Sequence, residues 1–108
     1  CMKKGDLAKL TLRKTLCKEE IKEKGTHVCS VLQYDGKQEC IFLQLQKSLL
    51  LERVSLDAIY LCEIESEDGT EACTGRVKER YQDERGNVLR FQIENGFYKI
   101  NIKSLTNI

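Results

Sequence analysis

Four basic side chains in the C-terminal half of the chain could together bind an anion. Arg76, Lys78 and Arg80 alternate along one predicted strand and so fall on one face, and Arg90 lies on the polar face of the next. A guanidinium group offers a planar fork of donors that matches phosphate oxygens. This face could therefore hold a phosphate, a nucleotide or an acidic partner. We favour the alternative, a solvent-exposed sheet face whose cations are interleaved with acidic residues such as Glu79.

Nucleic-acid binding through the same four cations is a second alternative, which the composition does not favour. The 18 lysine and arginine residues nearly cancel the 17 aspartate and glutamate residues, so no net field draws the chain to nucleic acid. Proteins that bind single strands also place aromatic platforms beside a basic groove. Only Tyr34, Tyr81 and Phe97 are candidates for such platforms.

Catalytic chemistry is not expected. A nucleophile needs a neighbouring base, and the single histidine, His27, is read as a surface or strand-edge residue. The carboxylates fall in solvated turns such as 65–68 and 83–84, without the apolar surroundings that raise a pKa for acid–base work. No phosphate-binding loop, dinucleotide fingerprint or nucleophile elbow is present. The sequence predicts neither an enzyme nor a cofactor.

The six cysteines do not predict a metal site. They are read as reduced thiols, several of them buried in strands, because no CxxC pair and no secretion signal accompany them. The acidic turn around Asp68 is flanked by predicted strands, whereas a calcium loop of the EF-hand type lies between helices. We therefore expect no bound metal. The cysteines are Cys1, Cys17, Cys29, Cys40, Cys62 and Cys73.

The elements that must position these residues are strands. Period-two alternation or β-branched and aromatic composition predicts strands at 3–13, 27–34, 39–45, 59–64 and 71–81. Asp35-Gly36 predicts a hairpin turn, and 65–70 and 83–87 read as polar turns. The charge-rich stretch 14–24 is expected to be an exposed connection. Residues 46–57 fit either one helical turn or an irregular crossing, and the sequence does not choose between them.

The strongest local signal is at Asn95-Gly96, a dipeptide typical of type I′ hairpin turns. A two-residue turn there places Ile93 opposite Tyr98 and Phe91 opposite Ile100, so that apolar residues face each other. The sequence therefore predicts strands at 89–94 and 97–103. With the strand before them, they form an antiparallel meander of three.

Together these elements predict one all-β domain over residues 1–108, a small antiparallel barrel of about six or seven strands with at most one short helical segment. No run approaches the roughly 20 apolar residues that span a bilayer, and no signal-peptide pattern is found. A cytoplasmic location without membrane contact is expected. A barrel with an internal ligand cavity is a third functional reading.

The order of features resembles a known family. The segment Lys4-Gly5-Asp6-Leu7-Ala8-Lys9-Leu10, a strand pair about Asp35-Gly36, an apolar crossing and a run of long strands are similar to the N-terminal domain of flagellar brake proteins. In those bacterial cyclic di-GMP effectors, a split β-barrel precedes a PilZ domain. The resemblance covers roughly residues 4–103 and implies a split or PilZ-like barrel that serves as an accessory module.

Arg76-Val77-Lys78-Glu79-Arg80 fits the RxxxR element of PilZ domains, but no D/N-x-S-x-x-G box follows it. The two arginines also fall within a predicted strand, whereas those of PilZ domains precede the barrel. The resemblance therefore implies an interaction module whose partner is another protein or, through an exposed strand edge, a second copy in a homodimer. Cyclic di-GMP is the alternative ligand of these arginines, and the resemblance does not carry its binding over to this chain.

Overall fold

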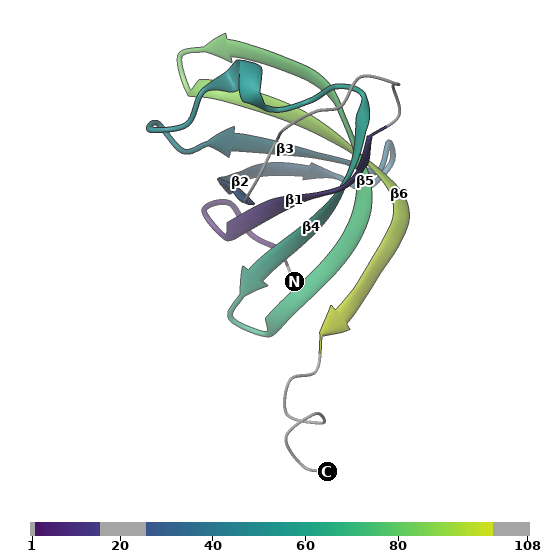
Figure 1. Cartoon of the computed structure of the whole chain (residues 1–108). Helices are drawn as coiled ribbons and strands as arrows, with labels where there is room; N and C mark the ends of the chain where they lie inside the picture. Colours follow the sequence, from purple (N-terminus) through teal and green to yellow (C-terminus); the bar gives the residue numbers. More distant parts are fainter. Residues whose placement is uncertain (1, 16–25, 101–108) are drawn as a thin grey trace.

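Six strands and one short 3-10 helix make up the described part of the chain. The computed structural model describes residues 2–15 and 26–100 (Figure 1). The elements are β1 (Leu7–Thr15), β2 (Thr26–Asp35), β3 (Cys40–Leu45), η1 (Leu51–Arg53), β4 (Ala58–Ser66), β5 (Gly69–Asp83) and β6 (Gly86–Ile100). No described helix is long and apolar enough to cross a membrane.

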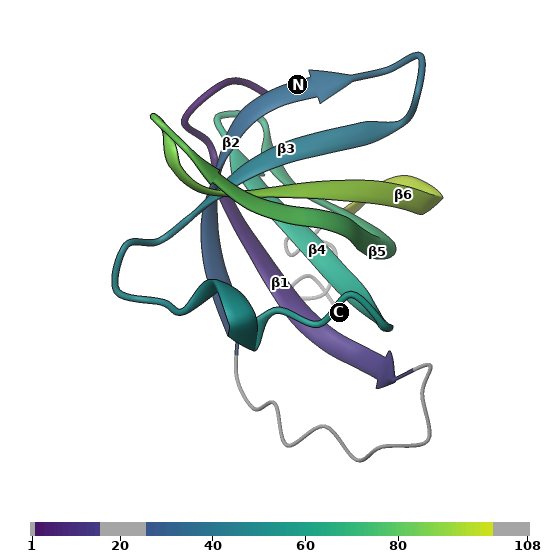
Figure 2. The same ribbon diagram turned by 90° about the horizontal axis from the view of Figure 1, so that it is seen from above.

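The strands form a closed antiparallel barrel in the order β1-β2-β3-β6-β5-β4, and β4 pairs back onto β1. Two three-stranded meanders, β1-β2-β3 and β4-β5-β6, are joined at β3–β6 and at β1–β4. The view from above shows the strands crossing around a common centre (Figure 2). The predicted all-β barrel is thus confirmed, with six strands.

Alternating burial explains why these segments fold as strands. Along β4 the residues Ala58, Tyr60, Cys62 and Ile64 are buried, while the residues between them are half-buried. The same period of two places apolar residues of every strand inside the barrel, where they form one core. The side chains of this core therefore point into the barrel and pack against one another.

The first two predicted hairpins are confirmed. β2 and β3 pair on either side of residues 36–39, and β4 and β5 pair about a two-residue turn at Glu67 and Asp68. The β5–β6 turn at 84–85 is equally tight and is followed by Gly86 with φ 97°. Glycine tolerates this left-handed conformation because it lacks a Cβ atom.

The hairpin predicted at Asn95-Gly96 is wrong. β6 runs through this dipeptide as one continuous strand, so Ile93 does not lie opposite Tyr98; instead Ile93 pairs with Gly75 and Tyr98 with Ala72, both on β5. A type I′ turn needs positive φ at both central residues, and neither Asn95 nor Gly96 has it. The 15-residue β5 supplies a partner for both halves of β6, and this long-range pairing overrides the local turn preference.

Asn95-Gly96 lies in a bulged region of the β5–β6 pair. Between the pairs Ala72–Tyr98 and Gly75–Ile93, β5 advances three residues and β6 advances five. The extra residues bend β6, and bulges are a common place for glycine and asparagine. The predicted alternation before the dipeptide is confirmed, because Leu89, Phe91 and Ile93 are buried while Arg90 and Gln92 are half-buried. The burial of side chains 98–103, predicted to alternate after it, lies outside what the structure describes.

The two uncertain connections have different outcomes. Residues 46–57 contain one 3-10 turn, η1, in an otherwise irregular crossing, so both readings hold in part. The predicted exposed connection 14–24 begins too early, because β1 continues to Thr15; residues 16–25 lie outside the described part of the chain. The end of the predicted last strand, 101–103, also lies outside it.

A first prediction concerns the closest approach of β5 to β6. A Cβ atom at Gly75 would lie 2.0 Å from the backbone oxygen of Gln92, which no side-chain movement relieves. We expect Gly75→Ala to lower the free energy of unfolding by about 3 kcal/mol, the upper range for overpacked sites. Urea denaturation followed by circular dichroism measures it.

Gly96→Ala is the matched control, because nothing lies within 4 Å of a Cβ atom there. We expect it to change the free energy of unfolding by less than about 1 kcal/mol. Equal destabilisation by the two substitutions would contradict the described β5–β6 register.

Candidate functional site

The four predicted site residues do not share one face. Lys78 is the extra residue of a bulge, because β5 advances two residues between Val77 and Glu79 while β6 advances one. Arg76 pairs with Gln92 and therefore lies on the outer face of the barrel together with Arg90. The predicted alignment of Arg76, Lys78 and Arg80 on one face is wrong. The bulge at Lys78 shifts the inward–outward alternation of side chains, so Arg76 and Arg80 face opposite sides of the sheet.

The two outer arginines are occupied by carboxylates. Arg76 Nε donates to Glu94 Oε2 at 2.9 Å, and Arg90 Nε donates to Glu79 Oε1. The hydrogen bond to Glu79, and then the one to the Cys40 thiol, raise the pKa of Arg90 above its ordinary value. These pairs neutralise the face that was considered for an anionic ligand. This agrees with the favoured reading of an ordinary solvated sheet face.

Arg80 has a structural role at one end of the barrel. It pairs with the buried Leu89, and its Nη1 donates to the backbone oxygens of Val54 and Glu52, the latter at 3.3 Å. These carbonyls belong to η1 and the residue after it. Arg80 therefore ties the crossing segment 46–57, here called the cap segment, to β5.

The cap segment is fixed at further points and exposes two leucines. Ser55 N donates to Tyr60 Oη at 2.8 Å, and Val54 is fully buried in the core. Leu50 and Leu56 remain 54% and 40% exposed. Among the described residues, the only other exposed large hydrophobic side chain is Tyr34. The cap segment thus presents apolar groups from a well-held backbone.

The aromatic residues considered as stacking platforms are not arranged along a basic groove. Tyr34 is 44% exposed and contacts Phe97 edge to face, with ring centroids 5.9 Å apart. Phe97 is partly buried and packs against the core. Tyr81 on β5 is half-buried. One exposed ring among the three candidates offers little to a single-stranded nucleic acid.

His27 is buried, which corrects the reading of a surface or strand-edge histidine. Its side chain is 7% exposed, and its ring contacts that of Tyr60 edge to face at 5.9 Å. No described group of three or more His, Cys, Asp or Glu side chains could hold a metal ion. The histidine is thus part of the packed barrel wall.

The core thiols are poor nucleophiles. Cys62 and Cys73 are directly paired on β4 and β5, and both are fully buried. Their mutual hydrogen bond, followed by burial, raises the pKa of Cys62, and burial alone raises the pKa of Cys29 to about 12. The folded-state pKa of Cys29 lies above the value of 9.0 expected in the unfolded chain, so the thiol ionises more readily in the unfolded state. Raising the pH above about 9 therefore lowers the free energy of unfolding.

The acidic turns carry local ion pairs. Glu65 and Glu67 contact Lys9 and Lys3, each at 3.6 Å. Asp83 lies 2.7 Å from Arg85, whose hydrogen bonds lower the pKa of this exposed carboxyl. Solvated, paired carboxylates of this kind are not poised for acid–base chemistry.

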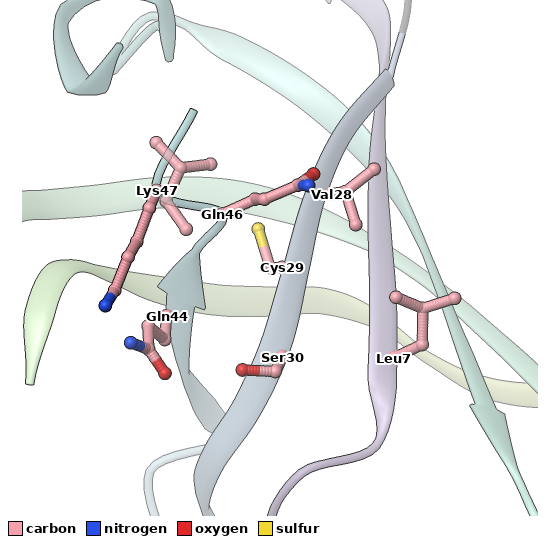
Figure 3. A pocket seen from close by; sticks show the side chains of 8 residues that line it. Leu7, Val28, Cys29, Ser30, Gln44, Gln46 and Lys47 are labelled. Atoms are coloured by element: carbon pink, nitrogen blue, oxygen red, sulfur yellow. The ribbon is translucent and has the colours of Figure 1, made fainter. Parts of the chain in front are cut away.

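A surface groove was missed by the sequence reasoning. Two open hollows, of about 270 and 530 Å³, share Gln44 and Lys47 as lining residues. Figure 3 shows the smaller one, with Leu7 and Val28 on one side and Gln44 and Lys47 on the other. The outward-facing apolar residues Leu7 and Val28, which interrupt the polar face of their strands, were the one available signal.

A second prediction tests whether Arg90 has a structural role as a cover for the Cys40 thiol. Arg90 Nη1 lies 3.6 Å from the Sγ atom of Cys40, a residue that is only 1% exposed. We expect Arg90→Ala to uncover this thiol and to increase its alkylation rate by iodoacetamide at least fivefold. Peptide mass spectrometry on the folded protein at pH 8 measures the rate.

Cys29 is the internal control, because a thiol with a pKa near 12 is ionised to roughly one part in ten thousand at pH 8. It should stay unlabelled in both proteins and react only in denaturant. Unchanged labelling of Cys40 in the variant would show that Arg90 does not cover it.

Comparison of the chain with family models, curated proteins and solved structures gives no match.

Proposed function

We propose that this chain is a non-enzymatic interaction module that binds another protein through its cap segment. The observation that carries this proposal is the exposure of Leu50 and Leu56 on a segment that Arg80 anchors to the barrel. Binding residues commonly sit on loops that a rigid scaffold holds in place. Apolar side chains presented in this way bind without first paying the entropy of ordering their backbone.

The electrostatics of the barrel also favour a protein partner over an anion on β5 and β6. Arg76 and Arg90 are paired with Glu94 and Glu79. A nucleotide or nucleic acid would have to displace these carboxylates before it could use the guanidinium groups. Nucleic-acid binding through this face is accordingly not favoured.

The cellular setting of the proposal comes from the resemblance to flagellar brake proteins. We propose that the barrel acts as an accessory module beside a PilZ domain, in cytoplasmic cyclic di-GMP signalling or motility of a bacterium. In this arrangement the PilZ domain holds the nucleotide, and the barrel supplies protein contacts. A second copy of the chain is the alternative partner.

The third prediction tests the docking surface. We expect the chain to bind an isolated PilZ domain of a flagellar brake protein with micromolar affinity in isothermal titration calorimetry. The double variant Leu50→Ser, Leu56→Ser should weaken this binding at least tenfold, because it removes both exposed apolar groups, and tenfold corresponds to about 1.4 kcal/mol.

Tyr34→Ser is the matched control, since Tyr34 is the third exposed large hydrophobic residue and lies away from the cap segment. It should leave the affinity unchanged. Equal loss in the control, or no loss in the leucine variant, would remove the cap segment as the docking surface. No binding to the PilZ domain, with or without cyclic di-GMP, would argue against the proposed setting.

The fourth prediction concerns cyclic di-GMP itself. Titrated into this chain alone, it should release no detectable heat, because Arg76 and Arg80 lie on opposite faces and both are engaged. Micromolar binding that is lost in both Arg76→Ala and Arg80→Ala would contradict this expectation. It would make the chain itself a nucleotide sensor.

A further inference from the structure

We infer that the groove formed by the two hollows binds a small organic anion. This lysine groove is defined by the residues that line it: Lys4, Leu7, Val28, Cys29, Ser30, Leu32, Gln44, Leu45, Gln46, Lys47 and 83–86. It lies on the outer face of β1, β2 and β3 and reaches the β5–β6 turn. It is separate from the cap segment's exposed leucines and goes beyond the proposed protein docking.

The floor of the groove is apolar. Leu7, Val28 and Leu32 are half-buried side chains on the outer face of β1 and β2. Leu32 is the extra residue of a bulge in β2 between Val31 and Gln33, and in this position it lines the groove. Leu7 and Val28 line the smaller hollow and Leu32 lines the larger one. An apolar ligand body seated in either hollow covers part of this surface and removes it from water.

The charge of the groove is set by two lysines. Lys4 and Lys47 are exposed, and neither makes an ion pair with any residue in the described ranges 2–15 and 26–100. Arg85 and Asp83 neutralise each other at 2.7 Å, which leaves Glu84 as the opposing charge at the far rim. An anionic group therefore fits best near Lys47, which lines both hollows.

The far wall of the groove is held in place. Gln44 Nε2 donates to the backbone oxygen of Arg85 at 2.7 Å and so fastens the β5–β6 turn against β3. Figure 3 shows the Gln44 amide and the Lys47 amine at the same side of the hollow, with Ser30 between Gln44 and Leu7 in this view. Together these groups present hydrogen-bond donors next to the apolar floor.

These features define the class of ligand. The larger hollow, of about 530 Å³, falls in the typical size range of small-molecule sites, roughly 300 to 1,000 Å³, and the smaller one, of about 270 Å³, lies just below it. The ligand should carry a carboxylate or phosphate group on an aromatic or aliphatic body. Inorganic phosphate alone would leave the leucine and valine surface uncovered and should bind weakly.

The fifth prediction uses 1-anilinonaphthalene-8-sulfonate, an aromatic organic anion whose fluorescence rises in apolar sites. We expect saturable binding to the folded chain with a micromolar dissociation constant that weakens with added salt. Lys47→Met should weaken binding at least fivefold. Lys78→Met removes the same charge from the exposed bulge of β5 and should have no effect.

Two competitor arms identify the anionic group. Displacement of the dye by decanoate indicates a carboxylate ligand, and displacement by guanosine monophosphate indicates a phosphate ligand; either supports the inference. Displacement by neither would overturn it. So would equal affinity in Lys47→Met and the native chain, or a loss confined to the Leu50→Ser, Leu56→Ser variant, which would place the dye on the exposed leucines.

A separate readout locates the site without the dye. Amide chemical shifts of Val28, Ser30 and Gln46 should move on addition of the competitor that displaces the dye. Shifts confined to other strands would place the ligand elsewhere. Because folding of Lys47→Met can be checked by its urea midpoint, loss of binding is distinguishable from loss of structure.

Discussion

The close approach of β5 and β6 at Gly75 is the constraint on which the barrel depends. The backbone oxygen of Gln92 occupies the space that a Cβ atom would need there. Up to Gln92, β6 lies between β5 and β3. After Gln92, β6 pairs with β5 alone among the described strands. The close approach at Gly75 and the bulges beside it thus lie where β6 leaves its pairing with β3.

The bulges that bend this strand pair also decide the chemistry of the surface. One extra residue at Lys78 sends Arg76 outward and brings Arg80 to the inner face beside Leu89. Arg76 then meets Glu94 on the outer face, whereas Arg80 reaches the carbonyls of the cap segment. A motif that suggests a phosphate clamp in the sequence thus becomes a surface ion pair and a structural tie.

Most of the fold could be predicted because it depends on local alternation. Ala8 and Leu10 on β1, and Tyr60, Cys62 and Ile64 on β4, are buried as period two requires. The turn predicted at Asn95-Gly96 was wrong for the opposite reason. The turn preference of the dipeptide is local, but its conformation is set by pairing with β5, some 20 residues earlier in the chain. Only the partner strand reveals that the dipeptide lies in a bulge.

The candidate site was less predictable than the fold. The side of the sheet on which Arg80 lies depends on the bulge at Lys78, and a bulge has no periodic signal in the sequence. The lysine groove combines Leu7, Val28 and Lys47 with a turn near Gly86, which are distant in sequence and adjacent only in the closed barrel. Outward apolar residues on β1 and β2 are visible in the sequence, but their common location is a product of the topology.

The two candidate binding surfaces lie on the outside of the barrel. Buried apolar side chains from all six strands form one core inside it. On the outer face of β5 and β6, carboxylates already satisfy Arg76 and Arg90. Free cations and apolar surface coincide instead in the lysine groove, which includes Gln46 and Lys47 at the start of the cap segment. The exposed leucines of the cap segment, Leu50 and Leu56, are not among the residues that line the groove. The groove and the exposed leucines therefore suit different occupants, an organic anion and a protein, and one barrel can carry both.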